Sequence, residues 1–123
     1  MNISVFVTGA TYGTGFAIAE KFAEEGFDVA FTARNREEIT SAEKSLSEKY
    51  KVKIKGYILE LTDINNVRSV FAEIKKDFGG LDTFVANGAA LGVGQDLLSV
   101  TVEEFDDLMN TNLRGTYFCC QSA

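Results

Sequence analysis

The stretch TGATYGTG, residues 8–15, decides the fold of this chain of 123 residues. It lies between an apolar run typical of a β-strand and the first apolar stripe of a helix. Gly9 lets the chain leave the strand in a tight turn, Gly13 lets the backbone approach a pyrophosphate closely, and Gly15 lets the helix pack near the sheet. The start of that helix offers unpaired N–H groups and the positive end of its dipole. The stretch therefore predicts a phosphate-binding turn, the alternative being a glycine-rich connection without a ligand.

Outward from this turn, β-rich runs alternate with amphipathic ones, which predicts a parallel sheet covered by helices. The expected strands are residues 3–8, 27–33, 52–61 and 81–86. The expected helices are residues 14–25, a second after Asn35, a third after Thr62 or Asp63 that stops at Gly79-Gly80, and a last one from Thr101 to the end of the chain. Right-handed crossovers between consecutive strands give the order 3-2-1-4, with helices on both faces of the sheet in three layers. We expect one α/β domain, residues 1–123, that stops in mid-architecture.

Helical spacing indicates which side chains each helix buries, and capping residues indicate where the helices begin. The expected inward residues are Phe16, Ala19, Phe22 and Ala23; Ile39, Ala42 and Leu46; Val67, Val70, Phe71 and Ile74; and Phe105, Leu108, Met109 and Leu113. Asn35 with Glu38, and Thr101 with Glu104, have the spacing of a capping box. Asp63 fits a helix cap better than a ligand.

Composition excludes several classes of function. The net charge is −6, and no stripe of Lys and Arg is present to neutralise phosphates, so we expect no nucleic-acid partner. No apolar run approaches the roughly 20 residues needed to cross a bilayer, and the first residues lack the pattern of a signal peptide, so we expect no membrane partner and a cytoplasmic protein. Without histidine, Ser-His-Asp and Cys-His catalysis are excluded and a protein-held metal is not expected. The adjacent Cys119 and Cys120 are interpreted as buried thiols.

The motif TGxxxGxG, matched at each fixed position by residues 8–15, resembles the short-chain dehydrogenase/reductase family, in particular members like 3-oxoacyl-acyl-carrier-protein reductase. The resemblance implies a Rossmann-type dinucleotide fold and a hydride-transferring oxidoreductase. It implies cofactor contacts from Gly9, Thr11, Tyr12, Gly13, Thr14 and Gly15. The family's NNAG motif corresponds to Ala86-Asn87-Gly88-Ala89, where Asn87 matches in place, so Asn87 and Gly88 are expected beside the cofactor.

Asn112-Leu113-Arg114-Gly115 fits the family's N-L-x-G run. The resemblance implies that Asn112 belongs to the catalytic tetrad, where it helps to hold a water of the proton relay. The alternative for Asn112 is a solvated polar residue on a helix.

The end of the second strand decides which dinucleotide is expected. An acidic residue there would bind the ribose 2′-hydroxyl of NAD, but Ala33 is followed by Arg34, whose guanidinium suits the 2′-phosphate of NADP. We therefore expect NADP in preference to NAD. The alternative is that Arg34 is a solvated charge paired with Glu37 or Glu38. Glu60 and Leu61 stand where the family contacts adenine, and Leu61 is included in the cofactor site.

The family's catalytic Tyr is followed four residues later by a Lys, but none of the four tyrosines here has that partner. The family's catalytic Ser has no counterpart either. We therefore expect the chain to be the cofactor-binding half of an NADP-dependent carbonyl reductase or alcohol dehydrogenase, inactive alone, whose longer parent forms a homo-oligomer (a dimer or tetramer). The alternatives are a non-catalytic dinucleotide-binding module and a structural fragment with an empty turn.

Overall fold

The computed structural model describes residues 2–91 and 96–123. The elements follow in this order: β1 (Ser4–Val7), α1 (Gly13–Glu24), β2 (Asp28–Ala33), α2 (Arg36–Lys49), β3 (Ile54–Ile58), α3 (Ile64–Phe78), β4 (Thr83–Val85), α4 (Val102–Met109), the π-helical segment η1 (Asn110–Gly115) and α5 (Thr116–Ser122). Within these ranges, no helix is long and apolar enough to cross a membrane. The same residues contain no cluster of three or more His, Cys, Asp or Glu side chains that could hold a metal ion.

The strands form one parallel sheet in the order β3-β2-β1-β4, which confirms the predicted order. Val5 of β1 pairs with Val29 of β2 on one side and with Thr83 of β4 on the other, and Val29 also pairs with Ile54 of β3. All strands point the same way, so their carboxyl ends meet at one edge of the sheet. The strand order reverses between the neighbouring strands β1 and β4, and at such a switch point a doubly wound sheet binds its ligand.

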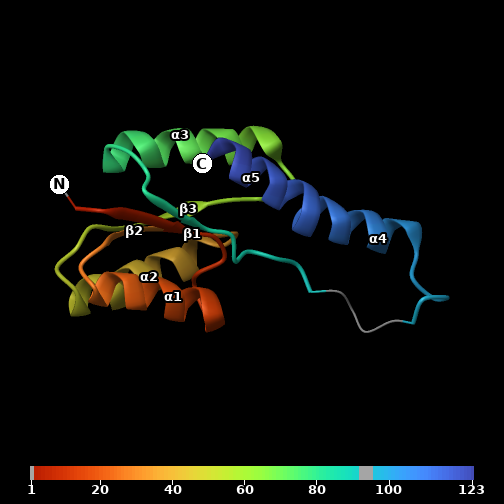
Figure 1. The fold of residues 1–123 in the computed structure, drawn as a ribbon. Coiled ribbons are helices and arrows are strands. Elements are labelled where there is room, and N and C mark those ends of the chain that lie inside the picture. The colour runs from red at the N-terminus through yellow and green to blue at the C-terminus, as the bar shows by residue number, and fades with distance from the viewer. Residues whose placement is uncertain (1, 92–95) are drawn as a thin grey trace.

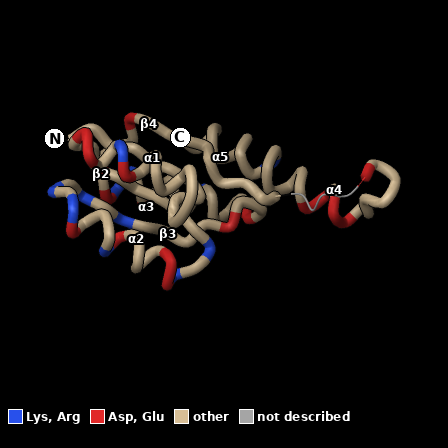
Figure 2. The backbone as a smooth tube through the Cα atoms, turned by 90° about the horizontal axis from the view of Figure 1, so that it is seen from below, with Lys and Arg blue, Asp and Glu red and all other residues tan. Residues whose placement is uncertain are grey.

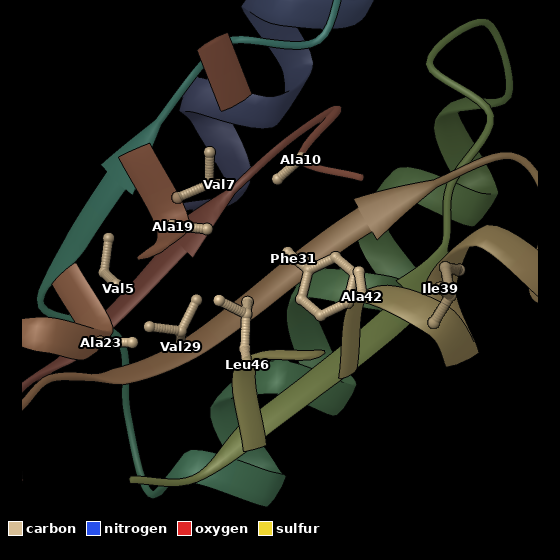
Figure 3. Packing of buried hydrophobic residues seen from close by; sticks show 10 residues of the cluster. All are labelled: Val5, Val7, Ala10, Ala19, Ala23, Val29, Phe31, Ile39, Ala42 and Leu46. Atoms are coloured by element: carbon tan, nitrogen blue, oxygen red, sulfur yellow. The ribbon is translucent and has the colours of Figure 1, made fainter. Parts of the chain in front are cut away.

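Helices α1 and α2 cover one face of the sheet, and α3 and α5 cover the other (Figure 1). Figure 3 shows the first core, in which side chains of β1 and β2 point toward both helices. Its buried residues are Val5, Val7, Ala10, Ala19, Ala23, Val29, Phe31, Ile39, Ala42 and Leu46. Burial of a large apolar side chain stabilises the fold by roughly 1.5–3 kcal/mol, so this core holds α1 and α2 against the sheet. The inward stripes predicted for α1 and α2 are confirmed, with Phe16 and Phe22 at the margin of the core.

The second core lies between the sheet and α3. The rings of Phe6, Phe71 and Phe84 pack edge-on or tilted, with centroids 4.9–5.4 Å apart. All four residues predicted to face inward on α3 are buried. Cys119 of α5 is buried in the same cluster, whereas Cys120 is exposed. The expectation of two buried thiols is therefore wrong for Cys120, because adjacent residues on a helix point in different directions.

Side-chain caps begin three of the helices at the predicted residues, although the full capping box forms at Thr101 and not at Asn35. Asn35 accepts hydrogen bonds from the N–H groups at the start of α2, Asp63 caps α3 at Asn66 N, and Thr101 forms a full capping box with Glu104. The carboxylate of Glu38 accepts a hydrogen bond from the Thr11 hydroxyl. This bond ties the glycine turn to the start of α2.

The last helical run departs from the prediction. It contains a wider π-helical turn, η1, between α4 and α5, and α4 buries none of its residues. Phe105, Met109 and Leu113, all expected to face inward, have 56%, 38% and 60% of their surface exposed. The physical reason is that α4 extends past the carboxyl ends of the strands, so the sheet does not lie beneath it (Figure 1). Figure 2 shows the same projection and the acidic positions along α4.

Candidate cofactor site

Thr8 directly follows β1 and joins the glycine turn to the loop that follows β4. Its N–H donates to Val85 O (3.2 Å), and its hydroxyl oxygen accepts hydrogen bonds from Asn87 N (3.1 Å) and Gly88 N (2.8 Å). Thr8 is buried, with 2% of its surface exposed. The two loops at the switch point of the sheet are thus held together by a residue that the sequence interpretation did not place in the site.

Asn87 completes this connection through its side chain. Its Nδ2 donates to Thr8 O (3.2 Å) and to Gly9 O (3.0 Å), so the turn rests on the amide of a residue about 78 positions further along the chain. The structure places Asn87 beside the glycine turn, where the resemblance implied it. Its contacts within the described residues support the turn.

Two of the three glycines are required by close packing. A Cβ on Gly9 would lie 2.9 Å from Gly88 Cα, and a Cβ on Gly15 would lie 2.2 Å from Gly9 O and 2.5 Å from Asn87 Nδ2. Distances this short leave no room for a side chain. Gly9 also has a φ of +63°, in the left-handed region. The roles predicted for Gly9 and Gly15 agree with this packing.

Gly13 has a different environment. Its φ is +59°, and apart from its chain neighbours and its own helix backbone, no atom of the described residues lies within 4 Å of the position that a Cβ would take. The surface above Gly13 is therefore open, as a turn that receives a phosphate requires. Tyr12, the N-cap of α1, has 78% of its surface exposed and makes no side-chain hydrogen bond to the helix. Thr14 is also exposed. The first turn of α1 thus presents its N–H groups toward this open surface without a side-chain cap.

Arg34 follows β2 at the carboxyl edge of the sheet, and its side chain is 79% exposed. Its Nη1 lies 3.9 Å from Oε2 of Glu60, which follows β3. The alternative partners considered from the sequence, Glu37 and Glu38, form no ion pair with Arg34 among the described residues. The Arg34–Glu60 contact joins the segments that follow two neighbouring strands. The sequence gave no sign of this contact, because the two residues are far apart in the chain.

Arg34 and Glu60 line a cleft of about 880 Å³. Its other lining residues come from the segment after β3 (Thr62), from the loop after β4 (Ala90, Leu91, Leu97, Val100 and Thr101), from α4 (Val102, Glu104, Phe105, Asp107 and Leu108) and from η1 (Thr111). The cleft opens at the carboxyl edge of the sheet, where a doubly wound sheet binds its ligand.

Leu61 lies between two glycines. A Cβ on Gly88 would come 3.3 Å from Leu61 Cδ1, and a Cβ on Gly115 would come 2.6 Å from Leu61 O. The end of β3 is thereby packed against both the loop after β4 and the end of η1. Leu61, expected at the adenine end of the cofactor, does lie next to Gly88.

Asn112 lies within η1, and π-helical turns are frequent at functional sites. Its Nδ2 donates to Ala90 O (2.9 Å), and its Oδ1 accepts from Ala90 N (2.7 Å). Asn112 is therefore not a solvated helix residue, because both atoms of its amide group fix the loop after β4. The sequence pattern found Asn112, but it gave no sign of Ala90 as its partner.

The sequence profile of the short chain dehydrogenase family matches residues 4–123. The sorbose reductase of Candida albicans is 40% identical over 117 residues, which are 94% of this chain and 41% of that protein. Among solved structures, L-sorbose reductase from Gluconobacter frateurii, complexed with NADPH and L-sorbose, matches with a TM-score of 0.91 and 26% identity over 98% of this chain and 46% of the other. The 3-oxoacyl-acyl-carrier-protein reductase of Brucella melitensis, in complex with NAD, matches with a TM-score of 0.86 and 30% identity over 99% and 47%.

The chain therefore belongs to the short-chain dehydrogenase family, and its fold is the Rossmann fold of that family. It spans about half the length, or less, of the relatives it matches. Of the two solved structures named above, the first holds NADPH and the second NAD.

Proposed function

We propose that this chain forms the cofactor-binding half of an NADP-dependent oxidoreductase that interconverts carbonyl and alcohol groups by hydride transfer. The observation that carries the proposal is the glycine turn. Gly9 and Gly15 are packed without room for a side chain, Thr8 and Asn87 hold the turn in place, and the surface above Gly13 is open. A turn that was only structural would not need this open surface at an uncapped helix start.

The residues at the turn fit a dinucleotide. The pyrophosphate would lie over Gly13, against the N–H groups of Thr14 and Gly15, with Thr11 and Tyr12 beside it. The adenine end would reach Leu61 and Gly88, and the far side of the turn is closed by Asn87. Once bound, the nicotinamide would supply or accept a hydride.

The proposed preference for NADP rests on Arg34. Its guanidinium is exposed at the end of β2, and Ala33 offers no carboxylate to a ribose 2′-hydroxyl. A charge-assisted hydrogen bond to the 2′-phosphate contributes about 1.5–3 kcal/mol, so the expected preference for NADP is on the order of ten- to a hundredfold.

Turnover requires a proton donor, and residues 1–123 contain no Tyr with a Lys four positions later. We propose that Asn112 serves the proton relay of the complete protein by holding Ala90 and the loop after β4 in place. The chain alone binds the cofactor and turns nothing over.

Substrate and assembly follow as proposals for the complete protein. The substrate is a small carbonyl compound or alcohol, and the two sorbose reductases make ketoses the first candidates to assay. We propose that the complete protein is cytoplasmic. We also propose that it is a homo-oligomer, because the apolar side chains exposed along α4 would be covered in an interface.

Titration with NADPH and NADH, followed by cofactor fluorescence, tests the proposal. NADPH should bind more tightly than NADH, and Arg34→Asp should erase or reverse the preference. Equal affinities in the wild-type chain would reject the assignment of Arg34. Failure to bind either cofactor would support the alternative of a structural fragment with an empty turn.

A further inference from the structure

The Arg34–Glu60 pair joins two groups that are held to different degrees. The backbone of Glu60 is fixed on both sides, since its N–H donates to Asn66 Oδ1 (2.7 Å) and its carbonyl accepts from Asp63 N (3.0 Å). Its Oε1 accepts a hydrogen bond from the Thr62 hydroxyl (3.2 Å), which leaves Oε2 as the atom that faces Arg34. The carboxylate is therefore anchored at the end of β3.

Among the described residues, no hydrogen bond holds the Arg34 side chain in the same way. Its side chain is 79% exposed, against 44% for Glu60, and its ion pair is 3.9 Å long, beyond hydrogen-bond distance. The guanidinium can thus leave the pair at little cost, because exposed ion pairs of this kind are weak. A phosphate bound near Arg34 would therefore compete with the anchored carboxylate of Glu60 for the Arg34 guanidinium.

Resting on the proposed function, we propose that Glu60 is a specificity-determining residue of the dinucleotide site. By drawing Arg34 toward the end of β3, it weakens the contact of Arg34 with a 2′-phosphate and so limits the preference for NADP. NAD carries a 2′-hydroxyl at this place, which leaves the Arg34–Glu60 pair undisturbed. The Glu60 carboxylate therefore lowers the affinity for NADP relative to the affinity for NAD.

Glu60→Gln tests this inference, because glutamine keeps the length of the side chain and an oxygen for Thr62 while it removes the charge. The dissociation constants of NADP⁺ and NAD⁺ are measured by isothermal titration calorimetry at low salt, with circular dichroism to confirm folding. We expect NADP⁺ to bind about three- to fivefold more tightly to the variant, the range that an exposed ion pair allows. The affinity for NAD⁺ should not change, and the gain for NADP⁺ should shrink at 0.5 M salt.

Glu48→Gln is the matched control, since it removes the same charge near the end of α2, where Glu48 is exposed and forms no ion pair among the described residues. It should leave both affinities unchanged. A gain in NADP⁺ affinity equal to that of Glu60→Gln would show that net charge alone is responsible, and would overturn the inference.

A second background separates an effect through Arg34 from direct repulsion of the phosphate. In Arg34→Gln, the added Glu60→Gln change should no longer alter the affinity for NADP⁺. An equal gain with and without Arg34 would contradict the inference, as would an unchanged NADP⁺ to NAD⁺ ratio in Glu60→Gln. If the wild-type chain binds neither dinucleotide, the proposed function itself fails. If it binds NADP⁺ but Glu60→Gln leaves the ratio of the two affinities unchanged, the inference about Glu60 alone fails.

Discussion

Gly15→Ala probes the tightest packing in the structure. Gly15 is buried in the first turn of α1, and the added Cβ would lie 2.2 Å from Gly9 O, 2.5 Å from Asn87 Nδ2 and 3.0 Å from Ala10 Cα. Two of these atoms belong to the backbone of the glycine turn and cannot rotate away. Either α1 or the turn must move, and the Asn87–Gly9 hydrogen bond of 3.0 Å lies in the path of both movements.

The magnitude follows from three contributions. Overpacking costs about 1–3 kcal/mol, and loss of the Asn87–Gly9 hydrogen bond costs about 1 kcal/mol. Alanine is the better helix former by about 1 kcal/mol, which offsets part of this. We expect Gly15→Ala to lower the free energy of unfolding by roughly 1–3 kcal/mol, and to weaken dinucleotide binding because the turn is displaced.

Urea unfolding followed by circular dichroism measures the first effect, and cofactor titration the second. For the unfolding measurement alone, Gly13→Ala is the control, since a Cβ at Gly13 makes no close contact and costs about 1–2 kcal/mol for its φ of +59°. A Gly15→Ala chain that is more stable than the wild type would show that helix propensity outweighs the contacts. That result would refute the packing argument for the turn.

Three further predictions address binding, stability and association. Gly13→Val should abolish binding of both dinucleotides by occupying the open surface above the turn, whereas Gly26→Val, also at positive φ in open space, should leave binding intact in the same titration. Tyr57→Phe removes a 2.7 Å hydrogen bond from a buried hydroxyl to Asp77 and should lower the free energy of unfolding by about 1–2 kcal/mol in urea at pH 7. The Lys55 ammonium, and next the Tyr57 hydroxyl, hold the pKa of Asp77 below its usual 3.8, so this stabilisation should be present above about pH 4 and be lost as the pH falls through the lowered pKa; stability that is flat through this range would contradict it. Light scattering after size-exclusion chromatography should detect dimers or larger species, because α4 and the edge of β4 are uncovered; a monodisperse monomer at high concentration would disprove this.

The sequence predicted the sheet and the first three helices because their periodicity is local. The stripe of α3 from Val67 to Ile74 lies on one side of one helix, and any sheet beneath it must bury that side. The stripe of α4 has the same period, but a period shows which side is apolar and not whether anything covers it. Phe105 and Leu113 are exposed for that reason.

The sequence pointed to the glycines and to Asn87 of the candidate site, but not to the contacts that join its separate segments. Gly9, Gly13 and Gly15 belong to a contiguous motif whose spacing has a direct physical reading. The bonds from Thr8 to the loop after β4 and the Arg34–Glu60 contact join segments that meet only once the sheet has formed. Such contacts follow from strand order and register, which local sequence patterns constrain but do not determine.

The measurement that most directly tests the central claim is a titration of the ¹⁵N-labelled chain with NADP⁺, followed by amide chemical shifts. The account predicts the largest changes at residues 11–15, 34, 60–62 and 87–90, with little change at the far ends of α2 and α3. Changes confined to other parts of the chain, or none at saturating NADP⁺, would contradict the assignment of the glycine turn as the dinucleotide site.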